Sequence, residues 1–262
     1  MHQIFKTQRE FMKEFGFDGM VTLSPENTAY MIGTPVPSQP NIRSRHVATI
    51  CTMKHDPIVI CVNIEEELVK KQSWIESNRV YSYNEFTTDP IVLLAEKLIE
   101  LGLDGCKVGI EFNYLPAKDY LTLIKFAPHI QFVDGAGLLD EMRKIKFQYE
   151  LDFIERFGKG AEDVIFSAFE GVSAGDTELD IYRILMNGWS QMGGDRPGLL
   201  IATGERSSML NAGPTSRVLR KGDMVRIDLV GTKNGYYCDV CRTAVVGEPT
   251  HQQAEIWDVV VK

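Results

Sequence analysis

Two aspartates, Asp228 and Asp239, lie eleven positions apart on either side of an Asn234-Gly235 pair. An Asn-Gly pair favours a two-residue hairpin loop, and such a loop pairs residues whose separation is odd. We therefore expect both carboxylates on one face of a strand pair, opposite or diagonal to each other. Both aspartates lie within β-prone runs rather than in the turn itself.

Carboxylates roughly 5 Å apart across a strand pair repel, so a chain that keeps them usually holds cations between them or shares a proton between them. Manganese, zinc, cobalt and iron ions accept carboxylate oxygens, and two such ions can share bridging carboxylates. The pair therefore predicts a site for two divalent metal ions, whose identity the pattern does not give. The alternative is a pair of solvated aspartates on the outer face of an edge hairpin, because acidic residues beside turns are common.

Cys238 and Cys241 flank Asp239 in a Cys-x-x-Cys arrangement. On a β-strand their side chains point to opposite faces, whereas a zinc knuckle or a redox pair needs two converging sulfurs. The five cysteines of the chain are odd in number and scattered, which indicates reduced thiols rather than a disulfide framework.

The bulk properties are those of an ordinary globular protein. A chain of 262 residues with 44% hydrophobic content is long enough for two domains, and its net charge of -8 argues against nonspecific binding to nucleic acid or to an anionic membrane. The first ten residues carry charges and no apolar segment, and no apolar run approaches the length of a membrane span. These features predict a cytoplasmic protein.

The secondary-structure pattern that must position the aspartates differs between the two halves of the chain. Up to about residue 142, helical and strand patterns alternate, which predicts an α/β domain with a mixed sheet. Its expected helices are 3–15, 26–32, 65–72, 89–101 and 116–126, and its expected strands are 19–23, 47–53, 57–63, 79–83, 107–111 and 130–134. Residues 143–262 read differently: a helix over 147–170, a second with Asp176 as its N-cap, strands at 197–203, 223–230 and 236–246, and a helix over 252–262.

Four stretches of the sequence resemble the creatinase and Xaa-Pro aminopeptidase (prolidase-like) family. They are Ser24-Pro-Glu-Asn-Thr-Ala-Tyr-Met-Ile-Gly33, Met142-Arg-Lys-Ile-Lys146, Pro214-Thr-Ser-Arg-Val-Leu219 and the segment from Gly222 to Thr243 that holds both aspartates. The resemblance implies a creatinase-like N-terminal α/β domain (1–142) followed by the first half of an α+β pita-bread domain (143–262). It also implies that Asp228 and Asp239 are the first metal ligands.

In the family, a second half-domain adds a histidine and two glutamates to the metal site. After Asp239 the candidates for these ligands are Glu248, His251 and Glu255. Their positions do not match those of the family's later ligands, so we interpret them as solvated surface residues. We therefore expect a truncated pita-bread domain, from the N-terminal part of a longer protein or from a truncated relative, and inactive on its own.

The sequence differs from the family pattern at one position. Relatives usually carry a histidine shortly before the Pro-Thr-x-Arg stretch, and this chain has Asn211 there. Asparagine can hold a carbonyl or an oxyanion but cannot exchange a proton near neutral pH. Asn211 is thus a candidate catalytic residue, with a structural role in the turn before Gly213-Pro214 as the alternative.

Arg43, Arg45 and His46 form a small basic cluster that can receive a carboxylate or a phosphate; the alternative is a solvated loop. In relatives, N-domain loops of one subunit often wall the active site of the other, so the resemblance implies a homodimer in which this cluster contributes to substrate binding.

The resulting functional prediction is a metal-dependent hydrolase of the Xaa-Pro peptidase type that acts on small peptides. Two alternatives stay open. One is a creatinase-like C–N hydrolase of a small metabolite, in which metal need not be used, and the other is a non-catalytic pita-bread module that binds a peptide or protein.

Overall fold

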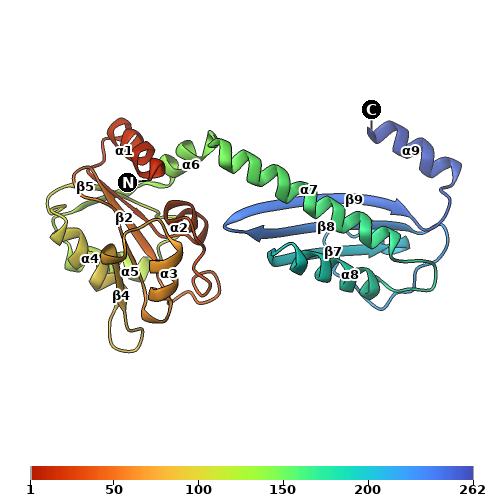
Figure 1. Cartoon of the computed structure of the whole chain (residues 1–262), viewed down its shortest axis with the longest axis horizontal. Coiled ribbons are helices and arrows are strands. Elements are labelled where there is room, and N and C mark those ends of the chain that lie inside the picture. The colour runs from red at the N-terminus through yellow and green to blue at the C-terminus, as the bar shows by residue number, and fades with distance from the viewer. Residues whose placement is uncertain (1, 262) are drawn as a thin grey trace. The chain divides into compact units, whose positions relative to one another are not determined.

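A computed structural model describes residues 2–261. The chain forms two compact units, one ending at Lys146 and the other beginning at Phe147 (Figure 1). Each unit has its own sheet and its own hydrophobic core.

The first unit is built on a six-stranded mixed sheet with the order β4-β3-β2-β1-β5-β6. The strands are β1 (Gly19–Thr22), β2 (Ala48–Thr52), β3 (Ile58–Val62), β4 (Val80–Tyr83), β5 (Lys107–Ile110) and β6 (Gln131–Asp134). β2 pairs antiparallel with β1 and β3, and the other pairs are parallel. The mixed sheet expected from the alternating pattern is confirmed.

Six α-helices accompany this sheet among the described residues: α1 (Gln3–Phe15), α2 (Pro25–Ile32), α3 (Glu66–Gln72), α4 (Pro90–Glu100), α5 (Ala117–Phe126) and α6 (Ala136–Lys144). Short 3-10 turns, η1 (Asn63–Glu65) and η2 (Ser77–Arg79), precede α3 and β4. Helix α6 was not among the helices expected from the sequence. It is a short segment of nine residues that buries Leu138, Leu139 and Met142, and so short a pattern gives a weak periodic signal.

The Ser24–Gly33 stretch has a structural role in this unit. Ser24 caps α2, and the buried carboxylate of Glu111 accepts hydrogen bonds from the Ser24 backbone N–H, the Ser24 hydroxyl and the Asn27 amide at 2.9, 2.7 and 2.7 Å. Arg143 in turn donates to the side-chain amide oxygen of Asn27, Oδ1, at 2.6 Å. These bonds satisfy a buried charge and link the end of β5, the start of α2 and helix α6.

The second unit contains an antiparallel three-stranded sheet with the order β7-β8-β9. Its elements are α7 (Gln148–Glu170), α8 (Glu178–Gln191), β7 (Asp195–Thr203), η3 (Gly204–Ser208), β8 (Met224–Lys233), β9 (Tyr236–Val245) and α9 (His251–Val261). Figure 1 shows α7 and α8 lying across one face of this sheet, and their apolar side chains form a core with every second residue of β8, namely Val225, Ile227 and Leu229. The opposite face of β8 therefore presents Arg226, Asp228 and Val230.

The start of α8 differs from the expected one. Thr177, not Asp176, is the N-cap, and it forms a capping box with Asp180. The Asp176 carboxylate instead accepts a hydrogen bond from the Ser173 backbone N–H at 2.7 Å, because it closes the turn that precedes the helix.

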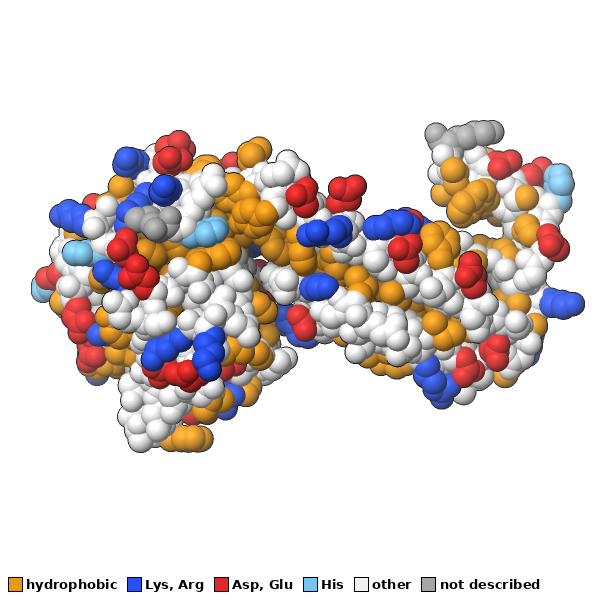
Figure 2. Space-filling view, viewed as in Figure 1, with side chains coloured by type: hydrophobic (Ala, Val, Ile, Leu, Met, Phe, Trp, Pro, Cys, Tyr) orange, Lys and Arg blue, Asp and Glu red, His pale blue; other side chains and the backbone are white. Residues whose placement is uncertain are grey.

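On the side of the molecule that Figure 2 shows, acidic and basic side chains are interspersed, and apolar side chains gather on α9. Those of Ile256, Trp257, Val259 and Val260 are all more than half exposed. Among the described residues, none of the helices combines the length and apolar character that a membrane span requires.

Candidate active site

The β8–β9 hairpin fixes the relation of the two aspartates. Lys233 pairs with Tyr236 across the Asn234-Gly235 loop, and both loop residues have positive φ, 53° and 81°. The register then pairs Asp228 with Cys241 and Val230 with Asp239. Asp228 and Asp239 are consequently diagonal neighbours on one face of the sheet, the face that α7 and α8 leave uncovered. The prediction that the carboxylates share a face is confirmed.

The environment of Asp228 disfavours a free carboxylate. Burial raises the pKa of Asp228, and the adjacent Asp239 raises it further. Its Oδ1 atom is shielded from solvent and has no hydrogen-bond partner among the described residues. Asp228 lies on the central strand of the sheet, so it is not a solvated aspartate at a sheet edge.

An acceptor oxygen without a donor, beside a second carboxylate, suits a divalent cation, since such ions are bound by carboxylate oxygens. The residues present therefore fit the expected metal, although the assignment of Asp228 and Asp239 as ligands stays a prediction. Within residues 2–261, no group of three or more His, Cys, Asp and Glu side chains is arranged to hold an ion. His251 and Glu255 contact each other at 3.5 Å on the exposed helix α9.

The two cysteines beside Asp239 lie on opposite faces, as expected for a strand. Cys238 is 8% exposed and packs in the core beneath α7 and α8, whereas Cys241 is exposed and stands directly across from Asp228. Burial raises the pKa of the Cys241 thiol, and the carboxylate of Asp228 adds to the effect.

A buried glutamate anchors the loop that carries Asn211. Glu178, at the start of α8, has no exposed surface. Its Oε1 accepts from the backbone N–H and the hydroxyl of Thr203, both at 2.9 Å, and its Oε2 accepts from the same groups of Thr215 at 2.8 and 2.7 Å. Arg206 completes the set with an ion pair. Burial alone would raise the pKa of Glu178, but the hydrogen bonds from Thr215 and Thr203 outweigh it and lower the pKa.

Arg217, in the Pro214–Leu219 stretch, connects the same loop to the start of β8. Its guanidinium donates to Glu205 at 2.9 and 2.6 Å, to Asp223 at 2.7 Å and to the Thr203 hydroxyl at 2.9 Å. These bonds lower the pKa of Glu205 to about 2 and also lower the pKa of Asp223. The Pro-Thr-x-Arg stretch thus fixes the loop by a network of charged hydrogen bonds.

Asn211 itself is exposed. The backbone on either side of it is held, since Arg226 of β8 donates to the carbonyls of Met209 and Leu210, both at 2.7 Å, and the Ala212 carbonyl accepts from the Ile201 N–H of β7 at 3.0 Å. The loop therefore adjoins the sheet face that carries Asp228. The catalytic role of Asn211 stays a prediction.

Two of the three residues of the basic cluster in the first unit, Arg45 and His46, already contact acidic side chains. Arg45 forms a two-bond ion pair with Glu85 at 2.9 and 2.7 Å, and His46 Nε2 lies 3.0 Å from Asp119, whereas Arg43 is exposed. The substrate-binding role of Arg43, Arg45 and His46 stays a prediction.

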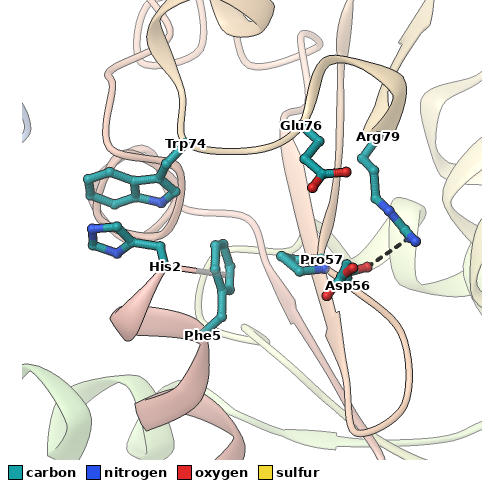
Figure 3. A pocket seen from close by; sticks show the side chains of 7 residues that line it. All are labelled: His2, Phe5, Asp56, Pro57, Trp74, Glu76 and Arg79. Atoms are coloured by element: carbon teal, nitrogen blue, oxygen red, sulfur yellow. Dashed lines mark hydrogen bonds between the residues drawn. The ribbon is translucent and has the colours of Figure 1, made fainter.

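The first unit also contains a cavity of about 200 Å³, shown in Figure 3. The His2 ring stacks on Trp74 with centroids 3.9 Å apart, and Arg79 donates to the Asp56 carbonyl at 3.0 Å. Trp74 also packs on Gly33 and donates to the Met31 carbonyl at 2.5 Å. These contacts join the start of α1 to the end of α2, which is a structural role.

Two residues of the second unit, Glu178 and Arg226, were not expected from the sequence. Glu178 has no sequence signal that separates it from an exposed glutamate in the first turn of a helix. The sequence did contain a signal for Arg226, because a residue two positions before Asp228 on the same strand must lie on the same face of the sheet.

Comparisons with known proteins agree with this architecture. Residues 5–145 match the family model of the Creatinase/Prolidase N-terminal domain, and residues 152–262 match that of Metallopeptidase family M24. An Xaa-Pro dipeptidase from Pyrococcus furiosus is 26% identical over 97% of this chain and 67% of its own length. An ectoine hydrolase from Halomonas elongata is 23% identical over 94% of this chain and 65% of its own length.

Among solved structures, the prolidase of Pyrococcus horikoshii superimposes with a TM-score of 0.80 at 24% identity, over 99% of this chain and 70% of that one. This likeness confirms the predicted fold class, an α/β unit followed by part of a pita-bread domain. The chain belongs to the creatinase/prolidase family, and it is a metallohydrolase of the Xaa-Pro peptidase type.

Proposed function

We propose that the protein cleaves the amide bond before proline in small peptides, with divalent ions held by Asp228 and Asp239. The observation that carries this proposal is the diagonal pair itself, in which the buried Oδ1 of Asp228 has no donor and Asp239 crowds it. Bound divalent ions would polarise the amide carbonyl and make a water molecule more acidic.

The residues around the pair have supporting tasks. Asp228 and Asp239 supply the negative charge that holds the ions, and the Asn211 side chain can donate a hydrogen bond to the scissile carbonyl without exchanging a proton. The bond before proline lacks an N–H and has a restricted shape, so a pocket can select it without reading many side chains.

The direct test is metal binding together with peptide hydrolysis. Titration of the full-length protein with Mn²⁺ and Zn²⁺ should show binding that Asp228→Asn and Asp239→Asn abolish, and its cleavage of an Xaa-Pro peptide should depend on the added metal. Asp195→Asn is the matched control, because Asp195 is an exposed acid at the start of β7. Metal binding that survives both substitutions would overturn the assignment.

A second candidate function is hydrolysis of a C–N bond in a small metabolite. It is favoured by Asn211, which stands where relatives usually have a histidine, and by the likeness to a relative named ectoine hydrolase. Comparing the turnover of Xaa-Pro dipeptides with that of small cyclic or guanidino carboxylates, each with and without added metal, discriminates between the two. A chain that binds no metal and cleaves neither class would be a binding module.

We further propose that the working ions are two divalent ions of manganese, zinc, cobalt or iron. We also propose that the protein is cytoplasmic and that it forms a homodimer in which Arg43, Arg45 and His46 contribute to substrate binding. Sedimentation of the purified protein tests the dimer. Unchanged KM in an Arg43→Met, Arg45→Met variant would remove the cluster from the binding site.

A further inference from the structure

The cavity of about 200 Å³ in the first unit combines apolar and charged lining residues (Figure 3). Phe5 and Pro57, which form part of its lining, are buried. A water molecule takes about 30 Å³ in the liquid, so the cavity has room for about six or seven. It is smaller than the clefts of about 300–1,000 Å³ that hold drug-sized ligands. Its size therefore suits a single small metabolite.

Opposite charges reach this cavity from one short turn. Glu76 precedes the 3-10 turn η2 and Arg79 ends it, and the Arg79 backbone N–H donates to the Glu76 carbonyl at 2.8 Å. Residues three apart eclipse each other in a 3-10 turn, so the two side chains leave it on the same side. In Figure 3 the Glu76 side chain extends toward Pro57 and the Arg79 side chain toward Asp56. The turn thus brings a carboxylate and a guanidinium to the same cavity.

These charged groups retain capacity for a ligand. Arg79 Nη1 donates to the Asp56 backbone carbonyl at 3.0 Å, which uses one of the several N–H groups of the guanidinium. Among residues 2–261, neither the Glu76 nor the Asp56 carboxylate forms an ion pair or a hydrogen bond, and both residues are exposed. Burial lowers the pKa of His2, so its ring is neutral at pH 7 and Arg79 is the cationic group at the cavity.

We propose that this cavity binds a free α-amino acid with an apolar side chain. The ammonium of the ligand binds the Glu76 carboxylate, and its carboxylate binds Arg79. The side chain of the ligand packs on Phe5 and Pro57. The ammonium nitrogen and the carboxylate carbon of an amino acid are about 2.5 Å apart, so one such ligand contacts two neighbouring opposite charges at once. A simple anion or cation satisfies only one of them, and charge-assisted hydrogen bonds at both ends therefore select the zwitterion.

This binding does not depend on the proposed peptidase activity. The lining residues of the cavity belong to the first unit, whereas Asp228 and Asp239 belong to the second. Binding is measured with a chelator present, so that metal-dependent binding at the two aspartates does not contribute. A failure of either proposal therefore leaves the other standing.

The test uses L-leucine and two analogues that each lack one charge, L-leucinamide without the carboxylate and 4-methylpentanoate without the ammonium. In ligand-observed NMR titrations of the full-length protein, L-leucine should bind with a Kd of about 1 mM or tighter, which is within reach of a ligand of this size. Each analogue should bind about 10-fold or more weakly, because it loses a hydrogen bond to a charged group. No binding of L-leucine at about 10 mM, or equal binding of the three compounds, would overturn the proposal.

Substitutions assign each end of the ligand. Glu76→Gln should weaken L-leucine binding about 10-fold or more and leave 4-methylpentanoate binding unchanged, whereas Arg79→Met should weaken L-leucine binding and leave L-leucinamide binding unchanged. A displaced turn would weaken all three compounds alike, so this crossed pattern separates recognition from a structural role. Glu67→Gln is the matched control, since Glu67 is an acid on α3 whose side chain is 74% exposed, and it should change nothing. Equal losses for all three compounds, or L-leucine binding that survives both substitutions, would contradict the assignment.

Discussion

Asp228 and Asp239 are diagonal neighbours across the β8–β9 ladder, and Cys241 stands directly opposite Asp228 on the same face. Two carboxylates and a thiol therefore share one patch of a sheet whose other face is buried under α7 and α8. Without a cation, this patch holds repelling charges.

Neutralising one aspartate should make the metal-free protein more stable while removing its metal site. Asp228→Asn is expected to raise the free energy of unfolding by about 0.5 kcal/mol, because it removes a cross-strand repulsion. The pKa of Asp228 is raised in the folded state, so its charge costs stability as the pH rises through the carboxyl range, and the gain should be present at neutral pH and vanish in acid. Urea denaturation in the presence of a chelator measures it, and a loss of stability at pH 7 would contradict the reasoning.

Removing the carboxylate of Glu178 should destabilise the second unit severely. Glu178→Ala leaves the donors of Thr203, Thr215 and Arg206 without their buried acceptor, and we expect a loss of about 3 kcal/mol. Glu155→Ala on the exposed side of α7 is the control and should change stability by less than about 0.5 kcal/mol. Equal effects of the two substitutions would refute the anchoring role.

Gly33 and Gly102 provide a matched pair for the first unit. Both have positive φ, 82° and 75°, but a Cβ on Gly33 would lie 2.4 Å from the Trp74 ring, whereas one on Gly102 meets nothing within 4 Å. Gly102→Ala should cost about 1 kcal/mol from backbone strain alone. Gly33→Ala should cost about 3 kcal/mol, since the clash adds to that strain. Thermal unfolding of both variants checks the difference.

The two neighbouring cysteines should react differently with iodoacetamide. Cys241 is exposed and Cys238 is buried, so peptide mapping of the native protein at pH 8 should find Cys241 modified first. Saturating Mn²⁺ should slow the modification of Cys241, because Asp228, which would help to hold the ion, stands directly across the strand pair from Cys241. Faster labelling of Cys238 would contradict the strand register.

The network around Arg217 should make the protein sensitive to acid. The pKa values of Glu205 and Asp223 lie below their unfolded values of 4.5 and 3.8, so their contribution is complete above about pH 5 and is lost as the pH falls toward 2. Arg217→Met should lower the Tm at pH 7 and flatten its fall between about pH 5 and 2. The exposed Arg156→Met is the control, and an unchanged acid slope in Arg217→Met would count against the network.

Much of the architecture was predictable because it depends on short-range patterns. The alternating helices and strands of residues 3–134 predicted a mixed sheet, and the Asn234-Gly235 turn predicted the face shared by Asp228 and Asp239. Helix α6 and the Thr177 cap were missed, because a nine-residue helix has little periodicity and because Asp176 and Thr177 are both good capping residues.

The sequence by itself determined that the two aspartates share one face of the hairpin, since a two-residue loop pairs residues of odd separation and side chains alternate along a strand. The strand register of the structure then placed them diagonally rather than directly opposite. Only the tertiary structure decided which carboxylate oxygens lack a hydrogen-bond donor. Glu178 has a carboxylate like that of Asp228, but Thr203 and Thr215, 25 and 37 residues away in the sequence, donate to it, whereas Asp228 Oδ1 is left without a donor. Whether a charge has a partner depends on contacts between distant segments of the chain, which local patterns do not encode.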